Sequence, residues 1–252
     1  MSEGSSSPRG QVELSVIIPA FNEEQRLPAA IPSLEAHLDQ LNLSAEVLII
    51  ENGSTDRTFE VADGFAANSS RVRALHLPER GKGRAARHGM LAATGKWLVL
   101  CDADFSMPVE YIERLVAALQ GGADVAIASR EVAGAVRIGE PWHRHAMGRV
   151  FNALVRWLML PGIQDSQCGF KAFRREAAQD LFAHETIDGW TFDVEVLYMA
   201  RRRGYRIVEV PIPWRYDASS RVQPVRDTIG MLRELLMLRW RAARGAYEPL
   251  HS

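Results

Sequence analysis

The sequence lacks the features that define several large classes of protein. It has only two cysteines in 252 residues, Cys101 and Cys168, which fit no cysteine-based metal spacing and favour a reducing compartment. No run of residues approaches the roughly 20 apolar positions of a membrane-spanning helix. The formal net charge is -1, so no global basic field favours nucleic acid as a partner.

Three signatures of known chemistry are also missing. The first apolar run, residues 12–19, is not followed by Gly-x-Gly-x-x-Gly, which argues against a dinucleotide-dependent enzyme. The basic segment at residues 80–84 contains two glycines but does not have the Walker A spacing. The seven histidines form no metal-ligand spacing, so we expect each of them to be structural or on the surface.

Length and composition suffice for one large α/β domain, with two small domains as the alternative. With 47% hydrophobic and 24% charged residues, the chain has the composition of a globular protein. Residues 1–11 are rich in Ser and Gly and are expected to form a disordered tail. We expect the main domain over residues 12–225, followed by an amphipathic helix and a tail over residues 226–252.

Strand and helix patterns alternate along the chain, as in a mainly parallel sheet with helices on both faces. Apolar runs predict strands at residues 12–19, 45–50, 72–77, 97–101, 124–128 and 206–211. Helical spacing predicts helices at residues 22–41, 56–68, 83–94, 108–120, 144–160, 191–203 and 226–244. Between them, residues 132–141 are expected to form a loop.

Two carboxylates follow the buried strand expected at residues 97–101. Asp102 and Asp104 are separated only by Ala103, so both leave the strand end together. Mg²⁺ and Mn²⁺ prefer oxygen ligands, and Mg²⁺ is often shared between one or two carboxylates and a substrate phosphate. Ligands of such sheets bind beyond the carboxyl ends of the strands. The triplet therefore predicts a divalent metal site on that rim.

Two more polar segments are expected on the same rim, and a basic segment at residues 80–84 precedes a predicted helix. Residues 19–23, beginning with Pro19 and including Phe21 and Glu23, end the first strand and open a helix whose N–H groups suit a nucleotide or its phosphates. Glu51 and Asn52 end the second strand, where they are placed to bond a base or ribose. The glycines and cations of residues 80–84 suit a phosphate or a base. Each segment alone is also compatible with an ordinary turn or helix cap.

Several strings in this order resemble one group of enzymes. They are residues 21–28 (FNEEQRLP), 80–83 (RGKG), 165–171 (DSQCGFK) and 190–195 (WTFDVE). From about residue 14 to residue 245 the chain resembles the inverting family 2 glycosyltransferases of the GT-A fold, and within them the polyprenyl-phosphate sugar transferases. The closer likeness is to dolichyl-phosphate β-glucosyltransferases. This resemblance implies a mixed, mainly parallel sheet flanked by helices.

The resemblance also implies a UDP-sugar donor bound with Mg²⁺ or Mn²⁺. Asp102 and Asp104 match the metal-binding triplet of the family, with Ala103 between them at the donor. The positions that match nucleotide contacts are Pro19, Phe21, Glu23, Glu51, Asn52 and Lys82. One departure concerns the base: the family commonly has Asp-Asp-Gly-Ser where this chain has Glu-Asn-Gly-Ser at residues 51–54.

The second half of the chain carries a local excess of positive charge. Residues 137–175 contain seven Lys or Arg against Glu140 and Asp165, a local +5. Arginine suits a phosphate through paired donors, and the helix expected at residues 144–160 adds an apolar face. A phosphate on a long lipid needs both a cationic and an apolar surface. We expect its phosphate to be bound by Arg130, Arg144, Lys171, Arg215 and Arg221.

The identity of a catalytic base is left open by the sequence. Asp193 and Asp165 are the candidates, with Glu195 third. A hydroxyl acceptor would need such a base, whereas a phosphate monoester is mostly a dianion at pH 7 and needs little help. Asp193 is alternatively placed to orient a sugar hydroxyl or an arginine.

The resemblance, together with these residues, implies inverting transfer of glucose from UDP-glucose to a polyprenyl phosphate. The helices at residues 144–160 and 226–244 combine Trp and Leu with Arg, which predicts peripheral binding to the cytoplasmic face of a membrane. The alternatives are another sugar, such as mannose from GDP-mannose, a different lipid phosphate, a hydroxyl acceptor, or nucleotide-sugar binding without turnover.

Overall fold

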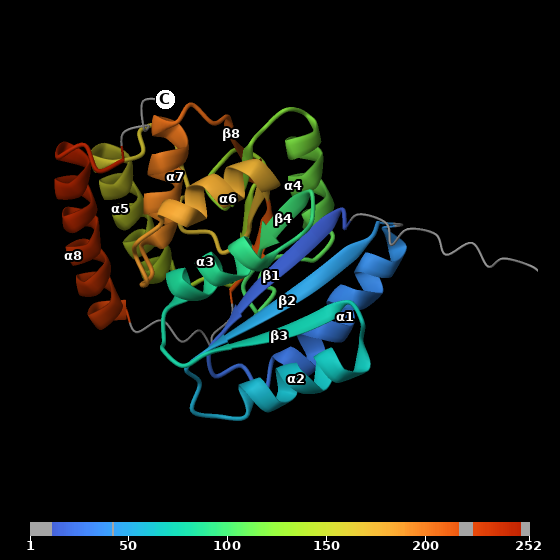
Figure 1. Ribbon diagram of the computed structural model, residues 1–252. Coiled ribbons are helices and arrows are strands. Elements are labelled where there is room, and N and C mark those ends of the chain that lie inside the picture. Colours follow the sequence, from blue (N-terminus) through green and yellow to red (C-terminus); the bar gives the residue numbers. More distant parts are fainter. Residues whose placement is uncertain (1–11, 42, 217–223, 248–252) are drawn as a thin grey trace, which may run out of the picture.

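The computed structural model describes residues 12–41, 43–216 and 224–247, with the backbone alone at residues 143–144 and 224–229. Its centre is a seven-stranded sheet of order β3-β2-β1-β4-β7-β5-β8 (Figure 1). The strands are β1 (Leu14–Ala20), β2 (Ala45–Asn52), β3 (Val72–Leu77), β4 (Trp97–Leu100), β5 (Val125–Ser129), β7 (Lys171–Arg174) and β8 (Ile207–Pro211). All neighbours pair in parallel except β7, which runs antiparallel to both β4 and β5. The expectation of a mixed, mainly parallel sheet is confirmed.

Eight helices cover this sheet in the part of the chain that the structure describes. They are α1 (Leu27–Gln40), α2 (Thr58–Asn68), α3 (Lys82–Ala92), α4 (Tyr111–Gln120), α5 (Trp142–Leu158), α6 (Arg175–His184), α7 (Phe192–Arg202) and α8 (Pro224–Ala243). None of the helices in the described ranges is long and apolar enough to cross a lipid bilayer.

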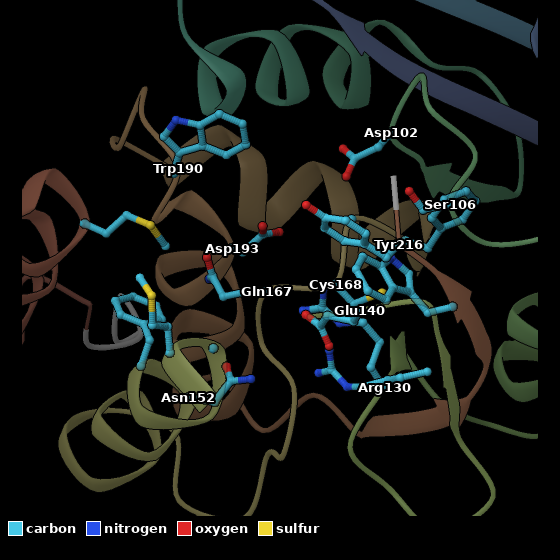
Figure 2. A pocket seen from close by; sticks show the side chains of 18 of the residues that line it. Asp102, Ser106, Arg130, Glu140, Asn152, Gln167, Cys168, Trp190, Asp193 and Tyr216 are labelled. Atoms are coloured by element: carbon cyan, nitrogen blue, oxygen red, sulfur yellow. The ribbon is translucent and has the colours of Figure 1, made fainter. Parts of the chain in front are cut away.

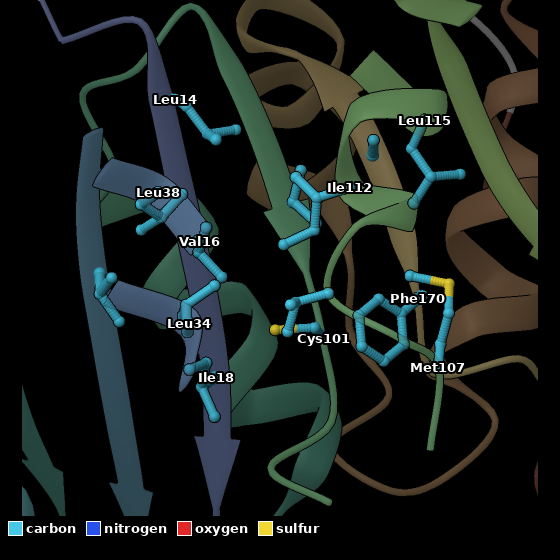
Figure 3. Packing of buried hydrophobic residues seen from close by; sticks show 14 of the residues in the cluster. Leu14, Val16, Ile18, Leu34, Leu38, Cys101, Met107, Ile112, Leu115 and Phe170 are labelled. Carbon is cyan, nitrogen blue, oxygen red and sulfur yellow. The ribbon is translucent and has the colours of Figure 1, made fainter. Parts of the chain in front are cut away.

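Two hydrophobic cores lie on the two faces of the sheet. Val16 and Ile18 of β1 belong to the core under α1, α2 and α4, whereas Ile17 between them belongs to the core under α3, α6 and α7. This alternation follows from the two-residue period of a strand. Figure 3 shows Leu34 of α1 against the first of these cores. Because both faces are covered, β1, β2 and β4 are apolar almost throughout, as a buried parallel strand requires.

The first predicted helix begins later than its sequence pattern indicates. The prediction placed its start at residue 22, but α1 begins at Leu27. Asn22 has a φ of 55°, in the left-handed region, which an α-helix does not use. Its side-chain oxygen instead accepts a hydrogen bond from Thr55 N at 2.8 Å and so joins the ends of β1 and β2.

Further elements correct the prediction. Residues 132–141 are not only a loop, because β6 (Val136–Ile138) pairs in parallel with β9 (Pro213–Arg215). The strand β7 and the helix α6 that follows it were not predicted at all. Short strands such as β6 and β7 hold too few residues to display a period, and their pairing partners are distant in the sequence.

The C-terminal helix α8 is packed into the main body of the protein. It begins at Pro224, two residues before the predicted start, and its Leu235 and Leu238 are fully buried in the core that α3 and α7 also cover. Figure 1 places α8 beside α5 at the edge of the molecule farthest from α1 and α2. The expected tail at residues 1–11 and the end of the chain at residues 248–252 lie outside the described residues.

Candidate active site

The carboxyl ends of β1 and β2 are tied together by an asparagine. Asn52 Nδ2 donates to Ala20 O at 2.9 Å, and Gly81 N donates to Asn52 Oδ1 at 3.1 Å. Pro19 pairs with Ile50 in the same ladder. The Asn52 amide is therefore used within the protein, where it fixes the rim on which β1, β2 and the start of α3 meet.

Neighbouring side chains complete this rim. Arg80 lies over the ring of Phe21, with Cζ 4.2 Å from the ring centroid, a cation–π contact that brings the 80–84 segment to the end of β1. Buried Glu51 accepts a hydrogen bond from Ser54 N at 2.5 Å and pairs with His76 Nδ1. Glu23 forms an ion pair with Arg26 at 3.0 Å. The structure brings the predicted donor residues together, while their contacts to a nucleotide stay a prediction.

The Asp102–Ala103–Asp104 triplet lies directly after β4 on that rim. Asp102 Oδ1 is 2.6 Å from Lys82 Nζ at the start of α3. Asp104 Oδ1 accepts from Ser106 N at 3.0 Å, and Ala103 is buried. The predicted phosphate-binding lysine and the predicted metal-binding triplet are thus in direct contact.

A glycine makes room for this triplet. A Cβ at residue 169 would lie 1.8 Å from Asp102 Oδ2 and 2.3 Å from its Cγ, far inside contact distance. Gly169 precedes β7 and belongs to the 165–171 segment, so an antiparallel strand from late in the chain shapes the early metal triplet. The sequence marks Gly169 only as part of a familiar string and not by its contact with Asp102.

The charges of this cluster perturb one another. Burial opposes the charged form of Lys82, but the carboxylates of Asp102, Asp193 and Asp104 outweigh that effect and raise its pKa. Burial likewise disfavours ionised Asp102, yet Lys82, Lys171 and Arg130 hold its pKa below the usual value. Burial and the adjacent charge of Asp102 raise the pKa of Asp104.

The donor set of Asp102 and Asp104 fits a divalent cation. Two carboxylates that repel each other on a strand end gain stability when a cation neutralises them. Among the described residues, no group of three or more His, Cys, Asp or Glu side chains is arranged to hold a metal ion. A cation held by Asp102 and Asp104 would have water or a bound phosphate to complete its ligands.

A cavity of about 630 Å³ extends from this cluster (Figure 2). Its polar end includes Lys82, Asp102, Asp104, Arg130 and Asp193. Its opposite wall is mainly apolar and comes from α5 and α8: Met147, Val150, Phe151, Leu154, Met231 and Leu232. The site therefore joins charged groups suited to phosphates with a surface suited to a hydrocarbon chain.

Arg130 reaches the cavity because a buried carboxylate orients it. Its Nε is 2.7 Å from Asp165 Oδ2 and its Nη2 is 2.9 Å from Asp165 Oδ1, a bidentate pair. Asp165 is fully buried, and despite the burial the charge of Arg130 keeps its pKa far below the usual range. Since both oxygens are occupied by Arg130, this geometry favours a positioning role for Asp165.

Lys171 and Asp193 form a second buried pair. The Lys171 Nζ is 2.7 Å from Asp193 Oδ1, and it also donates to Cys168 O at 2.5 Å. Asp193 lines the cavity, whereas Lys171 lies behind it with only 1% of its side chain exposed. Burial raises the pKa of Asp193, although Lys171 and Lys82 oppose that shift.

Arg215, another predicted phosphate ligand, is not among the residues that line the cavity. Arg215 is exposed at the end of β9, and its N donates to Ser106 O at 3.0 Å, close in the chain to Asp104. The side chain of Arg144 and the whole of Arg221 lie outside the described residues. Of the five predicted acceptor cations, Arg130 is the one whose described side chain lines the cavity.

Trp214 is an aromatic side chain of the cavity lining that was not predicted from the sequence. In the β6–β9 pair, Arg137 is the register partner of Trp214, and the guanidinium groups of Arg130 and Arg137 both lie over the Trp214 ring, 5.3 and 5.7 Å from its centroid. Tyr216 also lines the cavity. Because this pair joins two segments about 75 residues apart, a local pattern could not reveal it.

The chain is similar to glycosyltransferases over most of its length. Residues 15–182 match the model of the family described as Glycosyl transferase family 2. Glycosyltransferase AglD of Haloferax volcanii is 36% identical over 235 residues, which is 91% of this chain but only 37% of that protein. A dolichyl-phosphate beta-glucosyltransferase of Drosophila melanogaster is 36% identical over 251 residues, 94% of this chain and 77% of that protein. The human protein of the same name is 32% identical over 250 residues, with 93% and 77% covered.

Solved structures give the same fold. Glucosyl-3-phosphoglycerate synthase from Mycobacterium tuberculosis, crystallised with Mn²⁺, uridine diphosphate and phosphoglyceric acid, matches with a TM-score of 0.70. The match covers 95% of this chain and 80% of that one at 21% identity. The likeness supports the GT-A arrangement of the sheet and its helices.

Proposed function

The chain belongs to glycosyl transferase family 2, and from that premise we propose that it transfers glucose from UDP-glucose to a polyprenyl phosphate of the dolichyl type. The transfer is a single displacement that inverts the anomeric carbon and gives a β-linked product. One observation carries this choice of acceptor: the cavity has carboxylates and cations at one end and an apolar wall from α5 and α8 at the other. The names of the Drosophila and human relatives support the same acceptor and sugar.

The donor is proposed to lie along the rim of β1, β2 and β4. Pro19, Phe21, Glu23, Glu51 and Asn52 border its nucleoside, and Lys82 with Asp102 faces its phosphates. We propose Mg²⁺ or Mn²⁺ at Asp102 and Asp104, since the structurally similar glucosyl-3-phosphoglycerate synthase was crystallised with Mn²⁺ and uridine diphosphate. When bound, such a cation neutralises the charge that develops on the departing diphosphate.

The acceptor phosphate is proposed to face Arg130, at the polar end of the cavity. A phosphate monoester has a second pKa near 6 and is already mostly ionised at pH 7, so it attacks with little help in deprotonation. Lys171 does not contact the phosphate itself. It holds Asp193, which is placed to orient a hydroxyl of the sugar. Arg215, and Arg144 and Arg221 beyond the described side chains, remain candidates for the same phosphate.

The acceptor lipid requires the enzyme to meet a membrane, and we propose peripheral binding to its cytoplasmic face. Helices α5 and α8 expose large apolar side chains: Trp142, Met147, Val150, Trp157, Leu236, Met237 and Trp240. Trp142 and Trp157 are 81% and 80% exposed, which is unusual for tryptophan in water. Exposed Arg149 and Arg239 flank this surface, and basic residues near an anionic lipid surface contribute roughly 1 kcal/mol each.

A two-phase transfer assay tests the proposal. The protein is incubated with Mn²⁺, a polyprenyl phosphate and either labelled UDP-glucose or labelled GDP-mannose, and the mixture is extracted into organic solvent. We expect label in the organic phase from UDP-glucose only, and none with the Asp104→Ala variant. Label carried into the organic phase from GDP-mannose would show that the donor is GDP-mannose and not UDP-glucose. Label that stays in the aqueous phase and appears on a hydroxyl acceptor would show that the acceptor is a hydroxyl and not a lipid phosphate.

A further inference from the structure

Three hydrogen bonds join the C-terminal segment to the segment before and within α7. Glu234 Oε2 accepts from Thr191 N at 3.1 Å. Arg241 Nη1 donates to Thr186 Oγ1 at 2.6 Å, and Tyr247 OH donates to Glu195 Oε1 at 2.6 Å. Residues 234–247, in and after α8, are therefore hydrogen-bonded to residues 186–195 at three separate points.

Glu234 contacts Thr191, which directly follows the cavity-lining Trp190, and its contact is tight. A Cβ at Gly189 would lie 2.1 Å from Glu234 Oε1, so the carboxylate rests directly on the backbone of that residue. Thr191 is the N-cap residue of α7, yet its own side chain makes no cap hydrogen bond. A carboxylate beside a helix N-terminus is stabilised by the unpaired N–H groups and the helix dipole. Glu234 therefore supplies from α8 the polar contact that the start of α7 lacks.

The segment held in this way carries two side chains of the cavity. Trp190 lies between Gly189 and Thr191, and Asp193 lies in the first turn of α7; both line the cavity (Figure 2). The ring centroid of Trp190 is 5.1 Å from Lys82 Nζ, the ammonium that pairs with Asp102. Any shift of residues 189–193 away from α8 would move Trp190 and Asp193 relative to the metal triplet.

We propose that Glu234 is a positioning residue for the transfer reaction: it fixes residues 189–193 against α8 and thereby sets Trp190 and Asp193 at the reacting groups. This inference rests on the proposed function, because it assigns α8 a part in that reaction. The helix then serves the site twice, since its Met231 and Leu232 also form part of the cavity wall.

Full-length variants separate this role from a general contribution to folding. Glu234→Ala removes the acceptor of the Thr191 N–H, whereas Glu234→Gln keeps an oxygen that accepts it. Gly230→Ala is the matched control on the same helix, because a Cβ there meets nothing within 4 Å. With the lipid acceptor dispersed in detergent, we expect kcat to fall roughly ten- to hundredfold in Glu234→Ala, since small misplacements of reacting groups cost that much. Glu234→Gln and Gly230→Ala should stay within about threefold of the parent.

Tryptophan emission gives a readout that does not depend on turnover. The contribution of Trp190 is obtained by subtracting the spectrum of Trp190→Phe from that of the parent, and the same subtraction is made in the Glu234→Ala background. We expect the Trp190 contribution to move to longer wavelength in Glu234→Ala, as its ring becomes more exposed, and to stay in place in Glu234→Gln.

The outcomes distinguish this inference from the proposed function. If the parent transfers no sugar to lipid phosphate, the proposed function fails, while the Trp190 spectra still test the positioning by Glu234. If Glu234→Ala does not fold, Gly189→Ala tests the same contact from the other side, because its Cβ must push the Glu234 carboxylate away; we expect it to reproduce the loss of kcat and the spectral shift. Unchanged kcat and unchanged Trp190 emission in the folded variants would overturn the inference.

Discussion

Replacing Gly169 with alanine isolates the geometry of the metal triplet from its chemistry. All carboxylates remain, but the new Cβ would stand 1.8 Å from Asp102 Oδ2, where ordinary contact begins at 3.4 Å. The Asp102 carboxylate must therefore retreat by about 1.6 Å, whereas metal–ligand distances vary by only about 0.2 Å. The same movement stretches the 2.6 Å pair with Lys82.

We expect Gly169→Ala to lower both the Mn²⁺-dependent affinity for UDP and kcat/KM roughly 100-fold, equivalent to about 2.7 kcal/mol each. Affinity is measured by titration calorimetry with Mn²⁺ and again with EDTA, and kcat/KM in the two-phase assay. The native fold should survive, because the φ of residue 169 lies outside the left-handed region that L side chains rarely adopt. Gly64→Ala on α2, with open space at its Cβ, is the matched control. UDP affinity and kcat/KM within twofold of the parent would refute the argument that Asp102 must stand where it does.

Three other changes probe the buried charges and the exposed surface. Lys171→Met leaves the Asp193 carboxylate buried without its cation and should cost about 3–5 kcal/mol in urea unfolding; a cost below about 1 kcal/mol would argue against the pair. Burial raises the pKa of Glu185 to about 8 from an ordinary 4.5, so the native state holds a proton that the unfolded chain releases. The parent should therefore lose stability relative to Glu185→Gln as the pH rises from about 4.5 to about 8, and identical pH profiles in chemical unfolding would contradict this. Replacing Leu236 and Trp240 with Ser should release the protein from anionic vesicles in flotation without changing UDP affinity, and unaltered flotation would remove α8 from the membrane contact.

Much of the donor half could be predicted from the sequence. Its strands β1, β2 and β4 are apolar runs, so each can be recognised from the local sequence. β1 also pairs with β2, the next strand along the chain. Polar residues that end parallel strands must meet at one edge of the sheet. For that reason Asn52 and Asp102 were expected on one rim, and in the structure the 80–84 segment contacts both of them, through Gly81 and Lys82.

The acceptor half was predicted less completely, because its contacts join distant segments. The arginine cluster was visible as charge, but nothing in the sequence indicates that Arg130 is held by Asp165 or that Lys171 stands behind Asp193. The strand β7, which brings Lys171 and Gly169 beside the metal triplet, is four residues long and lies between β4 and β5. Too few residues repeat there for a period to be read.

The sequence by itself determined the family, the alternation of strands and helices, and the chemical types of group at the rim, because these depend on residue identity and local spacing. Tertiary structure decided which charged groups face the cavity and which form ion pairs with one another. Asp165 and Arg130 belong to one bidentate pair only because the ends of two separate segments meet there. Likewise, α8 reaches Thr191 through Glu234 only because Leu235 and Leu238 bury its inner face in the core. A pairing of this kind depends on how the whole chain packs, and no local pattern of residues records it.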